Sequence, residues 1–172
     1  MTYRNLFLTG EIGVGKSTAV DAAVAQLGLT PGGFRTRFDD KLAADRRLCL
    51  FPISGADARV AARFSDGHFL VDTACFDGFG AELIRAGLAA PLLLMDELGF
   101  LEARCAAFQA AVHEALDAPT PVLAVLRQSA GDWLDKLRAR PDAQLITVTR
   151  ENRDALPGTL AAMLRALLSA SA

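Results

Sequence analysis

Residues 8–20 of the 172-residue chain read LTGEIGVGKSTAV, a glycine-rich segment between an apolar run and a helix-like run. Within it, Gly10-Glu-Ile-Gly-Val-Gly-Lys-Ser17 matches the pattern G-x-x-x-x-G-K-[ST] at every fixed position. An apolar strand pattern at 5–9 precedes the glycines, and a helix pattern at 16–27 follows them and stops at Gly28. The sequence therefore predicts a strand, a glycine-rich loop and a helix, in that order.

The glycine-rich loop has the composition of a phosphate-binding site. Glycines let the backbone curl so that its N–H groups point inward, and the N-terminus of the following helix adds a positive dipole end. We expect Lys16 to reach the β- and γ-phosphates of a nucleotide, Ser17 to place its hydroxyl on Mg²⁺, and Thr18 to contact the α-phosphate side. The alternative is a tight turn that carries a lysine by chance, and the strand-loop-helix context favours the phosphate site. The residues expected to contact nucleotide here are Gly10, Glu11, Ile12, Gly13, Val14, Gly15, Lys16, Ser17 and Thr18.

Strand and helix patterns alternate along the rest of the chain. We expect strands at 33–38, 47–53, 68–71, 92–95, 121–126 and 144–149, and helices at 79–87, 103–116, 132–139 and 157–168. The charged residues 39–45 suit a connection between two antiparallel strands, whereas residues 54–67 show no clear period and are expected to form a loop or lid. This alternation predicts a mainly parallel, doubly wound α/β sheet with helices on both faces, an antiparallel hairpin, and one domain over residues 1–172.

Composition and charge exclude several classes of protein. A hydrophobic content of 52% argues against general disorder, and a net charge of −2 with dispersed basic residues gives no footprint for nucleic acid or an anionic membrane. The N-terminal apolar run is too short for a signal-peptide core, and the longest apolar stretch, 88–95, is far too short to span a membrane. Cys49, Cys75 and Cys105 are widely spaced without a CxxC pair, and His68 and His113 form no local metal motif. We therefore expect a cytoplasmic protein with cysteines as packing residues.

An acidic pair follows the apolar run Leu92-Leu-Leu-Met95. If this strand lies next to the strand of the glycine loop, Asp96 is placed to hold Mg²⁺ through water. Glu97 would then lie at the γ-phosphate and orient a water molecule for in-line attack as a general base. The alternative interpretation is a polar strand end or helix start. The predicted catalytic residues are therefore Lys16 and Glu97, and the predicted Mg²⁺ ligands are Ser17 and Asp96.

Further motifs carry a resemblance that covers nearly the whole chain. They are Gly33-Phe34, Phe69-Leu-Val-Asp72, Met95-Asp-Glu-Leu-Gly-Phe-Leu-Glu102, Phe108 and Val148-Thr-Arg-Glu-Asn-Arg-Asp154. With the glycine loop, the chain resembles the small nucleoside-triphosphatase family first described from thermophilic bacteria, which has a vertebrate member called the cancer-related nucleoside-triphosphatase. The resemblance implies a RecA-like α/β sheet and Mg²⁺-dependent hydrolysis of nucleoside 5′-triphosphates such as ATP and GTP to diphosphates and phosphate, with loose base choice.

Two departures from that family stand out. Phe100 takes the place of a lysine that commonly follows the D-E-x-G stretch, and Cys49-Leu50 replaces a common Gly-Phe pair. If that lysine binds phosphate or stabilises charge, we expect rate or specificity to differ in this chain.

Several side chains near the expected strand ends are left with open roles. Asn152 and Arg153 follow the last strand, where a base or ribose contact and a helix cap with a solvated arginine are both compatible with the sequence. Glu102 is either a residue that supports the site or a surface helix residue. An arginine is expected to stabilise charge on the transferred phosphoryl group, but the sequence does not single one out among Arg104, Arg127, Arg150 and Arg153.

Other functions use the same glycine loop. A nucleotide or nucleoside kinase is one, but a kinase benefits from excluding water rather than from a glutamate that orients it, and the loop 55–67 carries only Arg59 and Arg63. A GTPase switch is disfavoured because the Asn-Lys-x-Asp guanine reader is absent. A nucleotide-gated protein-binding switch stays open, since switches and hydrolases share these parts. The sequence identifies no protein partner and is compatible with a monomer.

Overall fold

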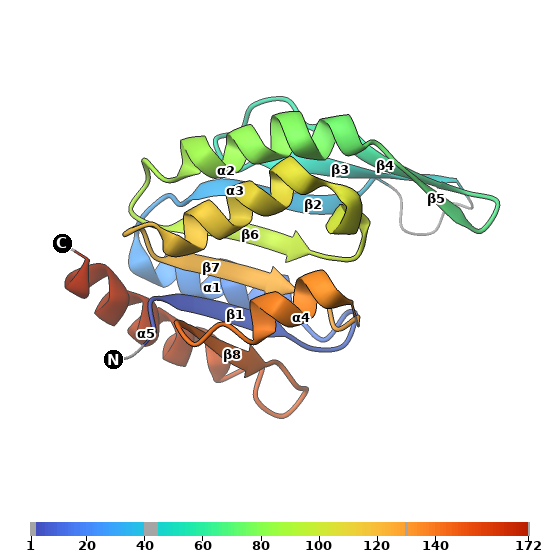
Figure 1. Ribbon diagram of the computed structural model, residues 1–172. Helices are drawn as coiled ribbons and strands as arrows, with labels where there is room; N and C mark the ends of the chain where they lie inside the picture. Colours follow the sequence, from blue (N-terminus) through green and yellow to red (C-terminus); the bar gives the residue numbers. More distant parts are fainter. Residues whose placement is uncertain (1–2, 40–44, 130, 172) are drawn as a thin grey trace.

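A computed structural model describes residues 3–39, 45–129 and 131–171 of the protein. Within these ranges eight strands form one sheet in the order β5-β4-β3-β2-β6-β7-β1-β8 (Figure 1). The strands are β1 (Asn5–Thr9), β2 (Gly32–Phe38), β3 (Arg46–Pro52), β4 (Arg59–Ser65), β5 (His68–Val71), β6 (Leu93–Leu98), β7 (Val122–Leu126) and β8 (Ala143–Thr147). The helices are α1 (Lys16–Leu27), α2 (Ala81–Gly87), α3 (Ala106–Asp117), α4 (Asp132–Arg138) and α5 (Leu156–Ala170).

The sheet has a parallel half and an antiparallel half. Strands β2, β6, β7, β1 and β8 run parallel to their neighbours, while β2, β3, β4 and β5 follow one another as antiparallel strands. The predicted mainly parallel sheet and the antiparallel pairing of the second and third strands are therefore confirmed. The expected connection at 39–45 falls largely on residues outside the described ranges.

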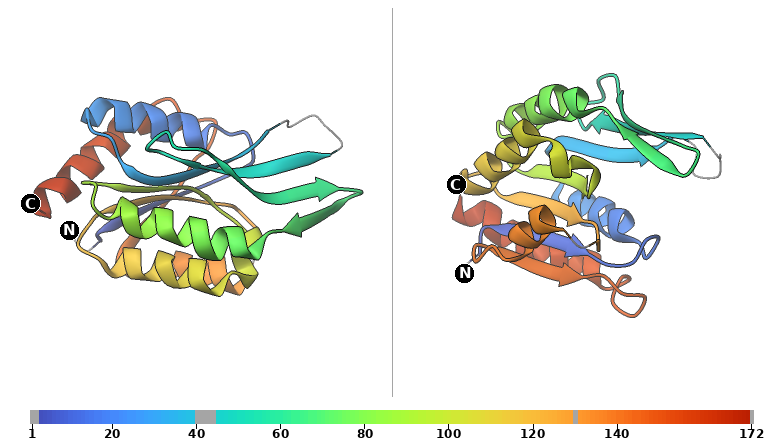
Figure 2. Two further views of the ribbon diagram at one scale, coloured as in Figure 1. Left: turned by 90° about the horizontal axis from the view of Figure 1, so that it is seen from above. Right: turned by 45° about the vertical axis from the view of Figure 1, so that its right-hand side comes forward.

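Two apolar layers cover the parallel half, one on each face. On β1, Phe7 belongs to the layer under α2, α3 and α4, whereas Leu6 and Leu8 belong to the layer under α1 and α5. The period of two in β-strands produces this division, because successive side chains point to opposite faces. Figure 2 shows α1 and α5 on one side of the sheet and the other helices on the opposite side, as predicted.

The expectation of a loop or lid at 54–67 is wrong. Residues Arg59–Ser65 form β4, which pairs with β3 on one side and β5 on the other, and the β4–β5 end of the sheet projects from the body (Figure 2). Ala61 and Ala62 are buried although their small side chains give little hydrophobic signal. Pairing with both neighbours satisfies the backbone groups, and this tertiary contribution outweighs the weak local pattern.

Several element boundaries also differ from expectation. Strand β6 continues through Asp96 and Glu97 to Leu98, a 3₁₀ turn at Leu101–Arg104 precedes α3, and a π-helical segment at Cys75–Gly80 precedes α2. The strand order also differs from expectation, because β7 lies between β6 and the glycine-loop strand β1. The acidic pair must therefore reach the loop across one intervening strand.

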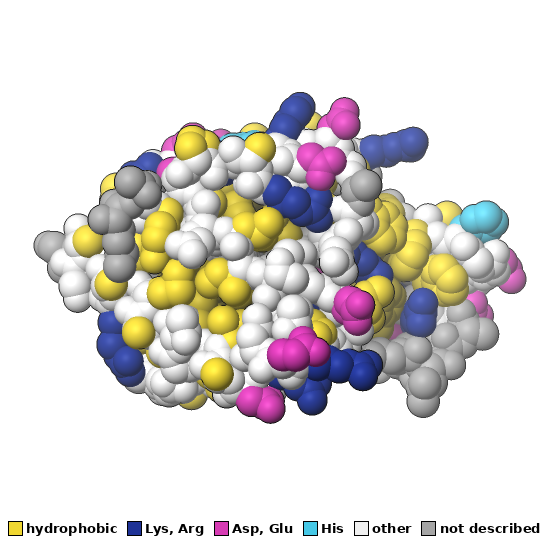
Figure 3. Space-filling model, turned by 90° about the horizontal axis from the view of Figure 1, so that it is seen from below, with side chains coloured by type: hydrophobic (Ala, Val, Ile, Leu, Met, Phe, Trp, Pro, Cys, Tyr) yellow, Lys and Arg dark blue, Asp and Glu magenta, His cyan; other side chains and the backbone are white. Residues whose placement is uncertain are grey.

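Charged side chains of both signs lie on the molecular surface. On the face viewed in Figure 3, Lys and Arg side chains lie beside Asp and Glu side chains, with hydrophobic side chains in patches between them. Among the described helices, not one combines the length and the apolar character required to cross a bilayer.

Candidate active site

The glycine-rich loop closes around the ammonium group of Lys16. Its Nζ donates hydrogen bonds to the carbonyl oxygens of Gly10, at 2.8 Å, and Glu11, at 2.9 Å. The Lys16 side chain is buried, and burial lowers its pKa, while the nearby carboxylates of Glu97 and Asp96 oppose that shift. The loop is thus curled about a cation placed at the N-terminus of α1.

Positive φ angles make this curl possible. Gly10, Gly13 and Gly15 have φ values of 143°, 77° and 110°, in the region that side chains disfavour. A Cβ on Gly10 would also lie 2.5 Å from the Val148 carbonyl oxygen. Val14 is buried in the core, whereas Glu11, Ile12, Ser17 and Thr18 are exposed. The loop is therefore anchored by the buried Val14 and Lys16 side chains, while Glu11, Ile12, Ser17 and Thr18 face outward.

Asp96 lies opposite the first turn of α1. Its Oδ1 accepts a hydrogen bond from Ser17 Oγ at 3.2 Å, and its Oδ2 accepts one from Arg35 Nη1 at 2.9 Å. Burial raises the pKa of this carboxyl group, and the Arg35 charge and the Ser17 hydrogen bond oppose that shift. A hydroxyl and a carboxylate oxygen at this separation form the type of oxygen donor set that Mg²⁺ prefers, with phosphate and water completing its coordination. The residues present therefore fit the predicted metal.

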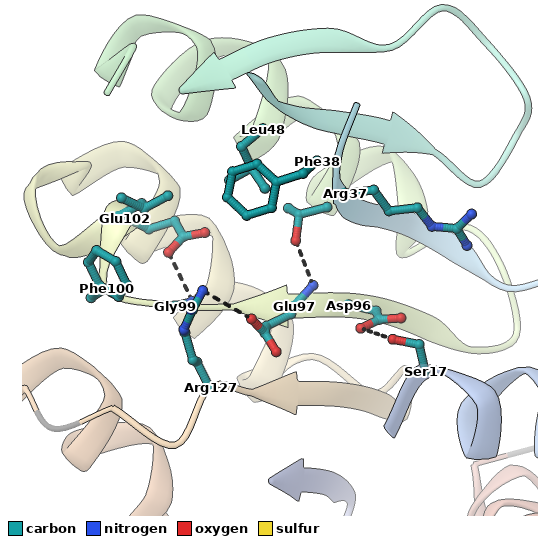
Figure 4. Close-up of a pocket in the computed structure, with 12 residues that line it drawn as sticks. Ser17, Arg37, Phe38, Leu48, Asp96, Glu97, Gly99, Phe100, Glu102 and Arg127 are labelled. Carbon is teal, nitrogen blue, oxygen red and sulfur yellow. Dashed lines mark hydrogen bonds and ion pairs between the residues drawn. The ribbon is translucent and has the colours of Figure 1, made fainter. Parts of the chain in front are cut away.

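Glu97 is half-buried in the adjacent cavity. Its Oε1 lies 3.7 Å from Arg127 Nη1, and its backbone N–H donates to Thr36 Oγ1 at 3.1 Å (Figure 4). Burial raises the pKa of the Glu97 carboxyl group, while the charges of Lys16 and Arg127 oppose the rise. The ion pair with Arg127 therefore holds the Glu97 carboxylate in the cavity.

A cavity of about 390 Å³ connects these groups. One wall carries Ser17, Asp96 and Glu97, and the opposite wall carries Phe38 and Leu48 (Figure 4). Leu101 also lines the cavity. Arg127 lies over the ring of Phe100, with its guanidinium carbon 5.2 Å from the ring centroid. The cavity thus combines a polar side suited to phosphate and water with an apolar side that restricts solvent.

The predicted residues Asn152 and Arg153 lie beside the glycine loop. The Asn152 Oδ1 accepts the Thr149 N–H and its Nδ2 donates to the Thr147 carbonyl, both at 2.9 Å, so the amide holds the turn after β8. Arg153 is half-exposed, and its Cδ would lie 3.7 Å from a Cβ placed on Gly15. This turn borders a hollow of about 360 Å³ that Gly10, Glu11 and Val14 also line. The contact to a base or ribose stays a prediction for both residues.

The structure adds residues that the sequence left open or did not indicate. Of the four candidate arginines, Arg127 is the one that lines the cavity beside Glu97. Arg35 and Thr36 contact the acidic pair from β2, and Glu102 is buried rather than on the surface. Arg127 was a candidate because it follows a predicted strand. The contacts of Arg35 and Thr36 with the acidic pair depend on β2 lying beside β6, and the sequence carries no direct signal for this strand order.

A glycine loop between a strand and a helix, with an acidic strand end facing it on a mainly parallel sheet, defines a P-loop nucleotide-binding protein. The family model described as "NTPase" matches residues 5–161. The chain therefore belongs to this NTPase family, and the resemblance found in the sequence is confirmed.

Individual relatives agree with this assignment. The nucleoside-triphosphatase THEP1 of Methanosarcina barkeri is 30% identical over 167 residues, which cover 92% of this chain and 95% of the relative. The cancer-related nucleoside-triphosphatase homolog of Bos taurus is 29% identical over 177 residues, covering 89% and 92% respectively. The crystal structure of THEP1 from Aquifex aeolicus superposes with a TM-score of 0.78 at 25% identity, covering 93% of this chain and 98% of that one. The predicted RecA-like P-loop fold class is confirmed.

Proposed function

We propose that this protein hydrolyses nucleoside 5′-triphosphates to diphosphates and phosphate in a Mg²⁺-dependent reaction. Membership of the NTPase family establishes the class of enzyme as a nucleoside-triphosphatase. The proposal adds three things to this class: the metal, the range of nucleotides and the roles of individual residues. The observation that carries the proposal is the position of the Glu97 carboxylate, which shares a cavity with Ser17 and Asp96 and lies 3.7 Å from Arg127.

The glycine loop binds the phosphate chain in this proposal. The N–H groups at 10–18 and the dipole of α1 attract the phosphates, and the Lys16 ammonium exchanges its bonds to loop carbonyls for bonds to the β- and γ-phosphates. Ser17 and Asp96 hold Mg²⁺, which neutralises charge on the phosphates when bound. Arg35 fixes the Asp96 carboxylate by its hydrogen bond to Oδ2.

Glu97 acts as the general base. Its carboxylate accepts a hydrogen bond from water and orients that water for in-line attack on the γ-phosphorus. Arg127 holds the carboxylate by the ion pair at Oε1 and supplies positive charge near the developing phosphate. The apolar wall of the cavity limits the number of water molecules around this pair, which strengthens both interactions.

The nucleoside end is proposed to lie in the hollow beside the turn after β8. Asn152 shapes that turn through its bonds to Thr147 and Thr149, and Arg153 lies next to the glycine loop. Charged, polar and apolar residues line this hollow together, among them Glu11, Arg150, Thr149 and Val148, and we propose that it accepts the nucleoside without strict base choice. We also propose a cytoplasmic location, on the basis of the widely spaced cysteines in the sequence.

Phosphate release from the isolated protein tests this function. We expect steady turnover of ATP, GTP, CTP and UTP with Mg²⁺, and its loss with a chelator. Asp96→Asn should raise the Mg²⁺ concentration required, whereas Asp57→Asn, an exposed carboxylate outside the cavity, should leave it unchanged. Labelled phosphate on an added nucleoside or monophosphate would instead identify a kinase. Turnover only with an added protein partner would identify a switch.

A further inference from the structure

Glu102 is a buried carboxyl group for which the proposed hydrolysis has no role. Its side chain lies in the 3₁₀ turn after β6 and is 2% exposed. Its Oε2 accepts a hydrogen bond from the Gly99 N–H at 2.9 Å (Figure 4). Burying a carboxylate is costly unless polar groups compensate for lost water, so this position requires a structural or functional reason.

The bond to Gly99 is supplemented by three hydrogen bonds that reach the turn at 98–102 from α3, α4 and the residue after β7. Trp133 Nε1 of α4 donates to the Gly99 carbonyl at 2.9 Å, and Gln109 Nε2 of α3 donates to the Glu102 carbonyl at 2.8 Å. The Arg127 backbone N–H donates to the Leu98 carbonyl, also at 2.9 Å. The turn is therefore held from α3, α4 and the end of β7, while Glu102 closes it from within.

This turn carries the groups around the proposed general base. Glu97 lies immediately before it and Phe100 lies within it. The Arg127 guanidinium contacts both of them, through the ion pair to Glu97 and the ring contact to Phe100. A change in the turn therefore alters the position of Arg127 relative to Glu97.

We propose that Glu102 is a positioning residue for hydrolysis, which orders the 98–102 turn through Gly99 and so sets the geometry of Glu97 and Arg127. The inference rests on the function proposed above. A misplacement of about 1 Å at a reacting group can cost on the order of a hundredfold in rate, so a residue that fixes this turn acts on turnover without touching the nucleotide.

The charge state of Glu102 makes this positioning depend on pH. Burial raises the pKa of Glu102 to about 7, the N–H groups of Glu102 and Gly99 oppose the rise, and the facing charges are Glu97, which raises it, and Arg127, which lowers it. Gln109 and Trp133, which approach from α3 and α4, are neutral. A carboxylate accepts a stronger hydrogen bond than a protonated carboxyl group does, so the turn is ordered above about pH 7 and loosens below it.

Fluorescence of Trp133 tests the inference without any nucleotide. Trp133 is the one tryptophan of the sequence, and its indole bonds to the Gly99 carbonyl. We expect the wild-type emission to change between pH 6 and 8 and Glu102→Gln to abolish that change. The His113 ring lies 6.4 Å from the Trp133 ring, so His113→Gln is the matched control for a change beside the indole and should keep the pH-dependent emission change. Loss of the change in His113→Gln but not in Glu102→Gln would overturn the inference.

Two further measurements separate this inference from the proposed function. Glu97→Gln should still show a fluorescence change, with its midpoint moved to lower pH because the Glu97 charge raises the pKa of Glu102, so the positioning role is measured even if hydrolysis follows another route. In steady-state kinetics, Glu102→Gln should lower kcat by roughly tenfold or more at pH 8, while its KM stays within about twofold of the wild-type value. The wild-type kcat should rise from pH 6 to pH 8, and this rise should be smaller in Glu102→Gln. An unchanged kcat and pH profile would contradict the inference. If Glu102→Gln does not fold, the wild-type protein provides the test: the NMR chemical shift of the Gly99 amide should change with pH with a midpoint near pH 7. A chemical shift that does not depend on pH would overturn the inference.

Discussion

Ser17 Oγ donates a hydrogen bond to Asp96 Oδ1 at 3.2 Å, although the two residues are 79 positions apart in the chain. One belongs to the first turn of α1 and the other to β6, and β7 separates β6 from the strand that precedes α1. Because parallel strands end at the same edge of a sheet, the loop after β1 and the acidic end of β6 meet there. This contact brings the predicted Mg²⁺ ligands together.

Lys16→Ala is expected to abolish productive binding of triphosphates. The variant loses the ammonium group that the loop encloses, and hydrogen bonds to charged groups contribute about 1.5–3 kcal/mol each. Affinity for a non-hydrolysable triphosphate, measured by calorimetry, should fall by roughly a hundredfold or more. Lys136→Ala, an exposed lysine on α4, should bind as the wild type does. Near-native affinity in Lys16→Ala would mean that the glycine loop does not bind the triphosphate.

Phe100→Ala is expected to lower turnover about two- to fivefold, because an exposed cation–π contact contributes about 0.5–1 kcal/mol and here it holds Arg127. The matched control is Phe51→Ala, since Phe51 on β3 is 38% exposed and Phe100 is 39% exposed. Steady-state kinetics compare the two. Equal loss of activity in both variants would mean that the effect arises from general destabilisation rather than from Arg127.

Gly87→Ala is expected to destabilise the fold by about 1–3 kcal/mol, the usual cost of overpacking. A Cβ at this position would lie 2.5 Å from Leu93 Cδ1 and 2.7 Å from the Gly33 backbone nitrogen, where α2 packs on β2 and β6. In contrast, a Cβ on Gly158 of α5 meets no atom within 4 Å, and Gly158→Ala should stabilise the protein by about 0.5–1 kcal/mol. Urea unfolding measures both, and equal effects would contradict the packing described for α2.

The ion pair of Asp142 and Arg140 is expected to contribute to acid sensitivity. Hydrogen bonds from Arg140 to Oδ1 and Oδ2, each 2.8 Å long, lower the pKa of the Asp142 carboxyl group in the folded state. A carboxyl group whose pKa is lowered in the folded protein stabilises the fold at pH values above its pKa in the unfolded chain, which is about 3.9. This stabilisation is lost as the pH falls through the pKa of the folded protein. The free energy of unfolding should thus fall between about pH 5 and 2, and less steeply in Asp142→Asn. An identical slope in that variant would assign the acid sensitivity to other groups.

Local chemistry explains how much of this site the sequence predicts. The curl of the glycine loop depends on residues that are adjacent in the chain, so Gly10, Lys16 and Ser17 are found from a short motif. The acidic pair is also recognised locally, because a run of four apolar residues before Asp96 indicates a buried strand end.

The remaining features depend on contacts between distant segments. The strand β4 was missed because its alanines carry a weak pattern that pairing with β3 and β5 supplements. The sequence does not distinguish Arg127 from three other arginines as the one near the transferred phosphoryl group. The position of β7 beside β6 in the sheet is what brings Arg127 next to Glu97. The burial of Glu102 arises from α3 and α4 packing on the turn, and its sequence position after a polar strand end gives equal support to a surface residue.

The turnover of Glu97→Gln tests whether the Glu97 carboxylate is the general base. Glutamine keeps the shape of the side chain but does not act as a base at neutral pH, so kcat should fall by roughly a hundredfold or more while the affinity for Mg²⁺-nucleotide stays unchanged. Glu82→Gln, an exposed position on α2, controls for the loss of a negative charge and should retain full activity. Single-turnover phosphate release with both variants gives the answer. Wild-type turnover in Glu97→Gln would contradict the assignment of Glu97 as the general base.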